Sequence, residues 1–415
     1  MATSSGPSVL QRTERGWMEG GTRHLGHNVR VIDEHSRPTR MRRARAAVRR
    51  TVDDAQLARP GLALGSMVLL CLMILGGSLM PVPYVIERPG PAIDVLGEYE
   101  DEQILVIDGA ETHATDGELM MTTVSVDGGP GYRVTPVEVV ASWFDRSQAV
   151  LPREAVFPAG QTREETVLTN SVAMSTSQQG AVAVALDELG IEYEPVVMVG
   201  GVEQDAPADG VLEGGDVVLS VNGSAAETVE GYRELARATE EGDDVQMRVR
   251  RGEEVLDLAV PTEEVDGAPR MGIVLSAGYD FPMDVEITVG EIGGPSAGMM
   301  FSLSVYDELT PGALTGGHRI AGTGTIDAEG AVGPIGGIRQ KMVGAHESDA
   351  EFFLAPSENC DEVVDYVPEG MDVVAVTDFE DAVEASETIA DSGDAEGLPT
   401  CEDVVSPTAR SGEGS

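Results

Sequence analysis

Hydrophobic residues are distributed unevenly along the chain, and the first apolar stretch is the longest. No residue between Arg59 and Glu87 is charged, and residues 62–79 are apolar apart from Gly and Ser. A run of this length is typical of a membrane-spanning helix, whereas a cleaved signal peptide has a shorter apolar core followed by a small-residue cleavage site. The run ends at Pro81-Val82-Pro83 without such a site. The pattern therefore predicts an uncleaved signal anchor over residues 61–82.

Beyond this anchor the apolar residues form short runs. Alternating runs predict strands at residues 103–107, 119–126, 196–199, 217–221, 245–249, 255–260 and 285–289. Helical spacing predicts helices at residues 175–189, 232–238 and 299–309. We therefore expect an α+β multidomain chain. Its exported parts are a connecting α+β region (83–187), a β-rich domain (188–266), an α+β domain (267–390) and an acidic flexible tail (391–415).

Charge is divided just as unevenly. Residues 1–60 hold 12 Arg and 6 Asp or Glu, whereas the other 355 residues hold 15 basic and 66 acidic side chains. The basic tail is predicted to be disordered and to stay in the cytoplasm, with the acidic domains exported as a single-pass membrane protein. Membrane lipid is then one expected partner. A net charge of −45 excludes a nucleic-acid partner, because phosphate backbones repel such a chain.

Only one basic residue is a lysine, Lys341, and the other 26 are arginines. A nucleotide-binding P-loop needs lysine within GxxxxGK[ST], but Lys341 follows Gly-Gly-Ile-Arg-Gln. No HExxH zinc motif occurs either. We therefore expect no ATP, no metal and no other cofactor.

A nucleophile is predicted where a strand turns into a helix. Gly293-Gly294-Pro295-Ser296-Ala297-Gly298 lies between the strand at 285–289 and the helix at 299–309. Backbone N–H groups at a helix N-terminus favour negative charge, so Ser296 is well placed for an attack that creates an oxyanion. The N–H of Ser296 and of a glycine such as Gly294 would stabilise that oxyanion.

A serine nucleophile needs a base. His318 and His346 remain candidates, but Lys341 lies among apolar neighbours after a tight Gly-rich loop. Burial disfavours an ammonium ion, and a lysine serves as a base once its pKa falls from about 10.4 to roughly 7–8. Arginine cannot do so, which gives a reason for a lysine at this position alone. The alternative is a lysine on a surface helix.

Two of the three cysteines lie in the exported part. Cys360 and Cys401 would be in an oxidising compartment, where a disulfide would fix the C-terminal tail to the last domain. Two free thiols are the alternative.

The β-rich domain resembles a PDZ domain. Gly-Asp-Val-Val-Leu-Ser-Val-Asn-Gly at residues 215–223 carries the resemblance, with apolar strands before it and a helix after it. The resemblance implies that a peptide is held by strand addition. We assign the groove strand to Val196, Val197, Met198 and Val199. A PDZ-like spacer without a free groove is the alternative.

The domain at 267–390 resembles the proteolytic domain of Lon proteases. Gly-Pro-Ser-Ala-Gly at 294–298, Thr323-Gly-Thr-Ile and Pro334-Ile-Gly-Gly-Ile-x-x-Lys341 occur in that order. The resemblance implies Ser296 as nucleophile, Lys341 as base and Thr323 as a residue that orients the amine. An anchor, a PDZ domain and this domain together resemble membrane-anchored Lon-like proteases of the YlbL type.

The resemblance implies an ATP-independent serine endopeptidase acting on unfolded or flexible polypeptides, and it implies a homo-oligomeric ring. Gly293 departs from the pattern, because many Lon sequences have Asp there. Two other functions remain open. One is a membrane-tethered PDZ adaptor with a Lon-like scaffold. The other is a GxSxG esterase using His346 as base and an acid such as Asp327.

Overall fold

The structure is a computed structural model, and it describes residues 60–78, 80–240, 242–252, 254–265, 268–290 and 292–406. The predicted basic tail therefore lies outside the described residues. By its internal contacts the chain divides into two compact units, residues 1–72 and 73–415.

Helix α2 spans Pro60–Ser78, and its side chains are described from Leu64 onward. The large apolar side chains between Leu64 and Leu75 are more than half exposed. Among the described residues, no helix combines the length and the apolarity that crossing a bilayer requires, so the predicted anchor is not supported.

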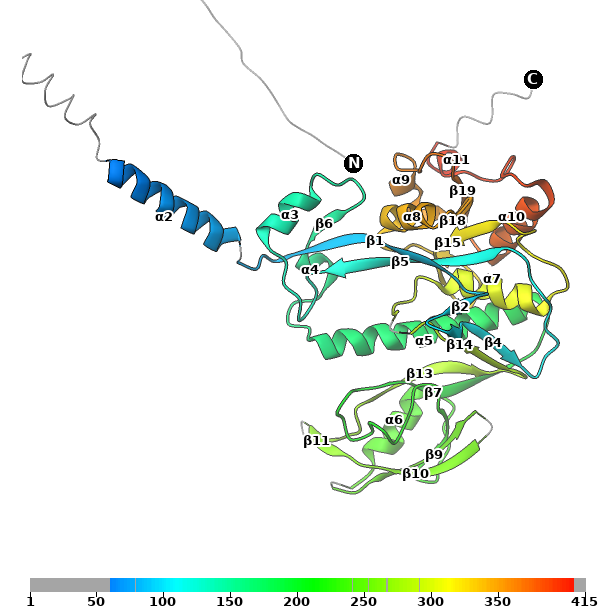
Figure 1. The fold of residues 1–415 in the computed structure, drawn as a ribbon. Coiled ribbons are helices and arrows are strands. Elements are labelled where there is room, and N and C mark those ends of the chain that lie inside the picture. The colour runs from blue at the N-terminus through cyan, green and yellow to red at the C-terminus, as the bar shows by residue number, and fades with distance from the viewer. Residues whose placement is uncertain are drawn as a thin grey trace, which may run out of the picture. The chain divides into compact units, whose positions relative to one another are not determined.

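The larger sheet has six strands in the order β19-β18-β15-β5-β1-β6 (Figure 1). The strands are β1 (Tyr84–Asp94), β5 (Glu118–Asp127), β6 (Ala149–Pro152), β15 (Arg319–Gly322), β18 (Phe352–Pro356) and β19 (Asp372–Val376). Strands β5, β15, β18 and β19 are parallel, and β1 runs antiparallel to β5 and β6. The predicted connecting region at 83–187 is thus not a separate part, because its apolar runs supply three strands of this sheet.

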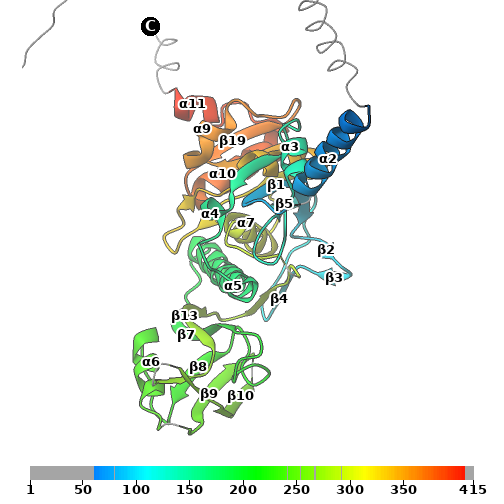
Figure 2. The same cartoon turned by 90° about the vertical axis from the view of Figure 1, so that its left-hand side faces the viewer.

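Helices cover both faces of the sheet. They are α3 (Pro136–Ser142), α4 (Arg153–Val156), α5 (Arg163–Glu188), α7 (Gly298–Leu309), α8 (Ile338–Glu347), α9 (Cys360–Val363), α10 (Phe379–Ser392) and α11 (Cys401–Val405), with a 3-10 turn at Ser357–Asn359. Alternation along β5 explains the two layers. Leu119 and Met121 share a buried cluster with α7 and α10, whereas Met120 shares one with α8 and α9. Figure 1 shows α7 and α8 on opposite sides of the sheet, and Figure 2 shows α7 between strands β1 and β5 and helix α5.

Helix α5 is longer than the sequence predicted. It begins at a capping box, in which the Thr162 side chain accepts from the N–H of Glu165 and the Glu165 carboxylate accepts from the N–H of Thr162. The apolar spacing from residue 175 marked only its second half. This helix packs against α7, and it also contacts β7 and β13 of the second sheet.

The second sheet has five strands in the order β10-β9-β8-β7-β13. Its elements are β7 (Glu194–Val202), β8 (Val217–Val221), α6 (Val229–Arg237), β9 (Val245–Arg251), β10 (Glu254–Val260) and β13 (Ile273–Asp280). The predicted boundary at residue 266 is therefore too early, because β13 completes this sheet by pairing with β7. The whole sheet is an insertion between α5 and β14 of the domain that is built on the six-stranded sheet.

Small pairings complete the fold. They are β2 (Glu98–Tyr99) with β3 (Glu102–Gln103), β4 (Leu105–Asp108) with β14 (Asp284–Ile287), β11 (Glu263–Val265) with β12 (Ala268–Arg270), and β16 (Thr325–Ile326) with β17 (Val332–Gly333). The β4–β14 pair joins a segment that precedes the inserted sheet to one that follows it. The domain that is built on the six-stranded sheet is therefore made from two separate stretches of chain.

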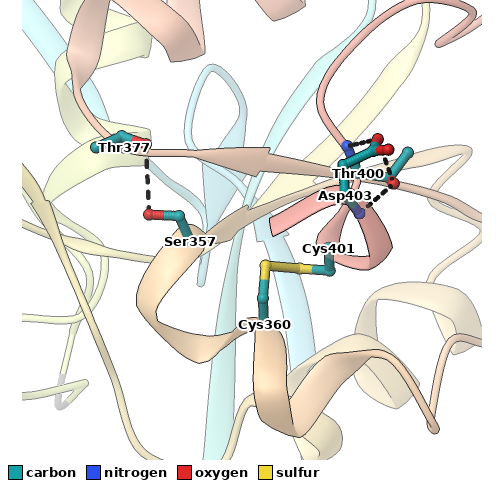
Figure 3. The surroundings of a disulfide bond; sticks show 6 residues. All are labelled: Ser357, Cys360, Thr377, Thr400, Cys401 and Asp403. Carbon is teal, nitrogen blue, oxygen red and sulfur yellow. Dashed lines mark hydrogen bonds between the residues drawn. A yellow bond between two sulfur atoms is a disulfide. The ribbon is translucent and has the colours of Figure 1, made fainter. Parts of the chain in front are cut away.

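A disulfide joins Cys360 at the start of α9 to Cys401 at the start of α11 (Figure 3). The backbone before Cys401 also pairs with β19, where the N–H of Ala375 donates to the carbonyl of Pro399 at 2.8 Å. Leu398 and Cys401 are buried. The predicted flexible tail from residue 391 is thus wrong as far as residue 406, because a disulfide, a strand contact and apolar burial fix this segment to the domain.

Candidate active site

Ser296 lies in the turn that leads from β14 into α7. The turn is shaped by Gly294, whose φ of +98° is in a range that favours glycine. The N–H of Gly294 donates to the carbonyl of Asn170 on α5 at 3.1 Å, so the prediction that this N–H binds the oxyanion is wrong, because the donor is already occupied. Gly298 begins α7 where a Cβ atom would lie 2.8 Å from the Oγ of Ser177. Two glycines and α5 therefore hold the Ser296 turn close to the domain core.

Lys341 reaches Ser296 from the opposite face of the sheet. Helix α8 begins after Gly337, whose φ of +72° lets the chain turn sharply into the helix. Its neighbours Ile338, Met342 and Ala345 are fully buried, and Lys341 is only 3% exposed. The Nζ of Lys341 donates to the Oγ of Ser296 at 2.7 Å. The structure thus brings together the predicted nucleophile and the predicted base.

Thr323 follows β15 directly and is fully buried. The Nζ of Lys341 donates to its Oγ1 at 2.8 Å, and that hydroxyl donates in turn to the carbonyl of Ser296 at 2.9 Å. The N–H of Gly324 donates to the same carbonyl, also at 2.9 Å. Thr323 therefore has both hydrogen-bonding roles of its hydroxyl satisfied, and it fixes the amine relative to the serine backbone.

Burial dominates the electrostatics of the lysine. It lowers the pKa of Lys341 to about 7, because an ammonium ion loses its hydration in the protein interior. No ion pair between described residues involves Lys341. A neutral amine can accept the hydroxyl proton of Ser296 across the same 2.7 Å contact.

The histidine-based alternative is not assembled. His318 faces the Glu351 carboxylate at 2.9 Å and the ring of Phe352. The Asp327 carboxylate accepts from backbone N–H groups of its own loop. Within the part of the chain that the structure describes, no histidine has a hydrogen bond to Ser296. Those residues also contain no cluster of three His, Cys, Asp or Glu side chains that could hold a metal ion.

The predicted groove strand, Val196 to Val199, forms the middle of β7. Strand β7 pairs with β13 along one edge. On the other edge Met198 pairs with Val217 of β8, and Val199 exchanges backbone hydrogen bonds with Gly215 and Asp216 just before β8. Both edges of Met198 and Val199 are therefore occupied, so these residues cannot accept a further strand. The strand that pairs on one side only and contacts α6 is β13.

Sequence reasoning missed the residues of α5 that touch the Ser296 turn. The Oγ of Ser177 donates to the carbonyl of Pro295 at 3.1 Å, and the backbone of Asn170 holds Gly294. Neither residue has a motif around it, and both are more than 110 positions away in the chain. Only the packing of α5 against α7 shows their role.

Comparison with known proteins agrees with this geometry. Residues 283–388 match the family model of the Lon protease (S16) C-terminal proteolytic domain. Residues 172–262 match the family model of the PDZ domain. The chain contains a Lon-type proteolytic domain and a PDZ domain. The first match covers the turn that carries Ser296 and the helix that carries Lys341, and the second covers most of the inserted sheet.

Individual relatives cover parts of the chain. A Lon protease of Mycoplasma mobile is 33% identical over 94 residues, which are 22% of this chain and 11% of that protein. Lon protease 1 of Bacillus subtilis is 28% identical over 109 residues, or 26% of this chain and 14% of that protein. The chain thus spans about an eighth of these Lon relatives. A solved PDZ domain of an SdrC-like protein from Listeria monocytogenes is 28% identical and covers 20% of this chain and 90% of its own, with a TM-score of 0.18.

Proposed function

We propose that this chain is an ATP-independent serine endopeptidase that uses Ser296 as nucleophile and Lys341 as general base. The observation that carries the proposal is the 2.7 Å contact between the Lys341 Nζ and the Ser296 Oγ, made by an amine that is 3% exposed. The Lon-type match supports proteolysis as the reaction.

The reaction follows from the contacts. The Oγ of Ser296 attacks the peptide carbonyl carbon while its proton passes to the Nζ of Lys341. The C–N bond then breaks as this proton is delivered to the leaving amine, which leaves an ester between substrate and Ser296. Lys341 next takes a proton from water, the resulting hydroxide attacks the ester, and the proton returns to Ser296.

ATP independence is proposed from the lysine count. The chain has one lysine, and a side chain that holds the serine proton cannot also bind nucleotide phosphates. Without an unfolding motor, the substrates proposed are flexible or unfolded polypeptides. The PDZ domain would bring them in through a peptide strand added beside β13, since β13 is an edge strand whereas β7 lies between β8 and β13.

Casein digestion by the purified full chain without ATP tests this proposal. Ser296→Ala and Lys341→Arg are the informative variants, and Ser386→Ala is the control, because it also removes a fully buried hydroxyl but lies on α10. We expect cleavage by the unchanged chain and the control alone. Activity in Lys341→Arg would show that another base operates, and activity in Ser296→Ala would exclude the dyad. No cleavage by the unchanged chain, even with peptide bound to the PDZ domain, would favour an adaptor.

We also propose that the chain is held at a membrane through residues 61–82, with its acidic domains on the extracytoplasmic side. The charge difference along the sequence and the exposed apolar side chains of α2 support this. The short helix α3 and the two residues after it expose Val137, Val140, Trp143 and Phe144. Val82 is hydrogen-bonded to Val134 just before this helix.

The two tryptophans of the chain, Trp17 and Trp143, make a direct test available. In a Trp17→Phe variant mixed with anionic vesicles, brominated lipid should quench Trp143 fluorescence and the protein should float with the vesicles. Protein that stays with the aqueous fraction would contradict membrane attachment. If the protein floats with the vesicles while acrylamide in solution still quenches Trp143 fluorescence, the attachment is limited to residues 61–82.

A further inference from the structure

Helix α5 lies outside the stretch that matches the Lon-type domain, yet it holds the nucleophile turn at two points. The carbonyl of Asn170 accepts from the N–H of Gly294, and the Oγ of Ser177 donates to the carbonyl of Pro295. The two contacts are two helical turns apart on α5, at 3.1 Å each. They bracket the peptide bonds immediately before Ser296.

The contact of Ser177 is unusual for a serine within a helix. Such a hydroxyl commonly bonds to the carbonyl four residues earlier in its own helix. The buried hydroxyls of Ser302, Ser304 and Ser386 do so. Ser177 is also buried, at 5% exposed, but its hydroxyl bonds to a carbonyl 118 residues away.

The partner of Ser177 belongs to the same peptide group as the backbone N–H of Ser296. A peptide group is planar and almost always trans, so its C=O and N–H point in opposite directions. A hydrogen bond that fixes the Pro295 carbonyl therefore also fixes the direction of the Ser296 N–H. Among the described residues, this N–H has no hydrogen-bond acceptor. It is thus free to bind the oxygen on which charge develops.

We propose that Ser177 is a positioning residue for the oxyanion donor: by holding the Pro295 carbonyl, it aims the N–H of Ser296 at the tetrahedral intermediate. The inference rests on the proposed endopeptidase activity. It assigns to α5 a role in transition-state stabilisation, while Lys341 and Thr323 handle the proton on the other side of the serine.

Ser177→Ala removes one hydroxyl from a packed helix and tests the proposal in the full chain. Kinetics with a flexible peptide substrate should show kcat lowered about 10- to 100-fold with KM nearly unchanged, because a misaimed donor weakens binding of the transition state alone. The pH midpoint of the reaction should not move, since Lys341 keeps its contacts. The kcat of Ser177→Cys, which keeps a weak donor, should lie between those of the unchanged chain and Ser177→Ala.

A peptide boronic acid gives a readout that a purely structural defect would not change. Its boron bonds to the Ser296 Oγ and forms a tetrahedral adduct with an oxygen in the oxyanion position. In Ser177→Ala its inhibition constant should rise by about the factor by which kcat/KM falls. Ser386→Ala, which loses a hydroxyl bonded within its own helix, should leave the inhibition constant and kcat/KM unchanged.

Each other result has a definite meaning. An unchanged kcat in Ser177→Ala would overturn the positioning role. So would a smaller fraction of active enzyme, determined by titration with the boronic acid, if the remaining enzyme binds this inhibitor with unchanged affinity. Both results would leave the endopeptidase proposal intact. Absence of turnover in the unchanged chain would overturn the endopeptidase proposal itself, and the role of Ser177 with it.

Discussion

The lowered pKa of Lys341 predicts how activity depends on pH. Burial holds this pKa at about 7 instead of 10.5. At pH 8 the neutral amine then makes up about 90% of the population, compared with about 0.3% for an unperturbed lysine. Burial thus supplies roughly 300 times more base at this pH. We expect kcat/KM to rise about tenfold per pH unit below pH 7 and to level off above pH 8.

Because Lys341 is the only lysine in the chain, its titration can be observed directly. Incorporation of lysine labelled with carbon-13 at the ε position gives a single side-chain NMR signal. Its chemical shift should titrate with a midpoint near 7, matching the midpoint of the kcat/KM profile. The Ser296→Ala variant provides a stable sample for the spectra, and it retains the burial that lowers the pKa.

A midpoint above 9 in the NMR titration would refute the reasoning, since burial would then not neutralise the amine. A midpoint near 7 with activity still rising beyond pH 9 would show that some other group limits the rate. With a midpoint above 9, the 2.7 Å contact would have to be interpreted as an ordinary hydrogen bond from an ammonium group to the serine.

The remaining predictions concern hydrogen bonds and stability. Lys341→Met should be inactive, yet more stable than the unchanged chain by about 4 kcal/mol at pH 6. The lysine pKa is lower in the folded than in the unfolded state, so this advantage should fade as pH rises from about 7 to 10.5 in urea titrations, and a pH-independent difference would contradict it. Thr323→Val removes one partner of the amine and should lower kcat/KM about tenfold without changing KM, measured on the same peptide. Replacing Cys360 and Cys401 by serine should cost about 3 kcal/mol of unfolding free energy, and unchanged urea midpoints under reducing and oxidising conditions would count against this. Gly344→Ala should destabilise the domain by about 2 kcal/mol, because its Cβ would overlap the carbonyl oxygen of Gly90 on β1, and a thermal midpoint equal to that of the unchanged chain would exclude this contact.

The sequence predicted the parts of the site that depend on local pattern. Ser296 was identifiable because a strand, a Gly-rich turn and a helix follow one another within a few residues. Lys341 was identifiable because it is chemically unlike every other basic residue of the chain. The helix that positions Ser177 was predicted only in part, and its contact with Pro295 was not, since a hydrogen bond across 118 residues leaves no periodic signal.

The same limit explains the errors in domain organisation. Strand β5 was recognised from its alternation, but its partner β15 lies about 200 residues later in the chain. Strand β13 was missed and the groove was assigned to β7, because the sequence shows that a strand is apolar without showing which of its edges is free. Pairing partners depend on tertiary packing, which no short stretch encodes.

The insertion of the PDZ domain has a consequence for how such a chain could arise and be rebuilt. Glu194 and Asp280 lie opposite each other on β7 and β13, so the chain leaves the proteolytic domain and returns to it at neighbouring points. A whole domain can be gained or lost there in one genetic event without changing the strand order of the six-stranded sheet. A short linker from residue 193 to 281 should therefore yield a compact protease, provided that polar residues replace Leu168 and Val172, which α5 packs against the removed strands. A fragment that begins after the PDZ domain would instead lack β1, β5 and α5, and with them half of the framework around Ser296.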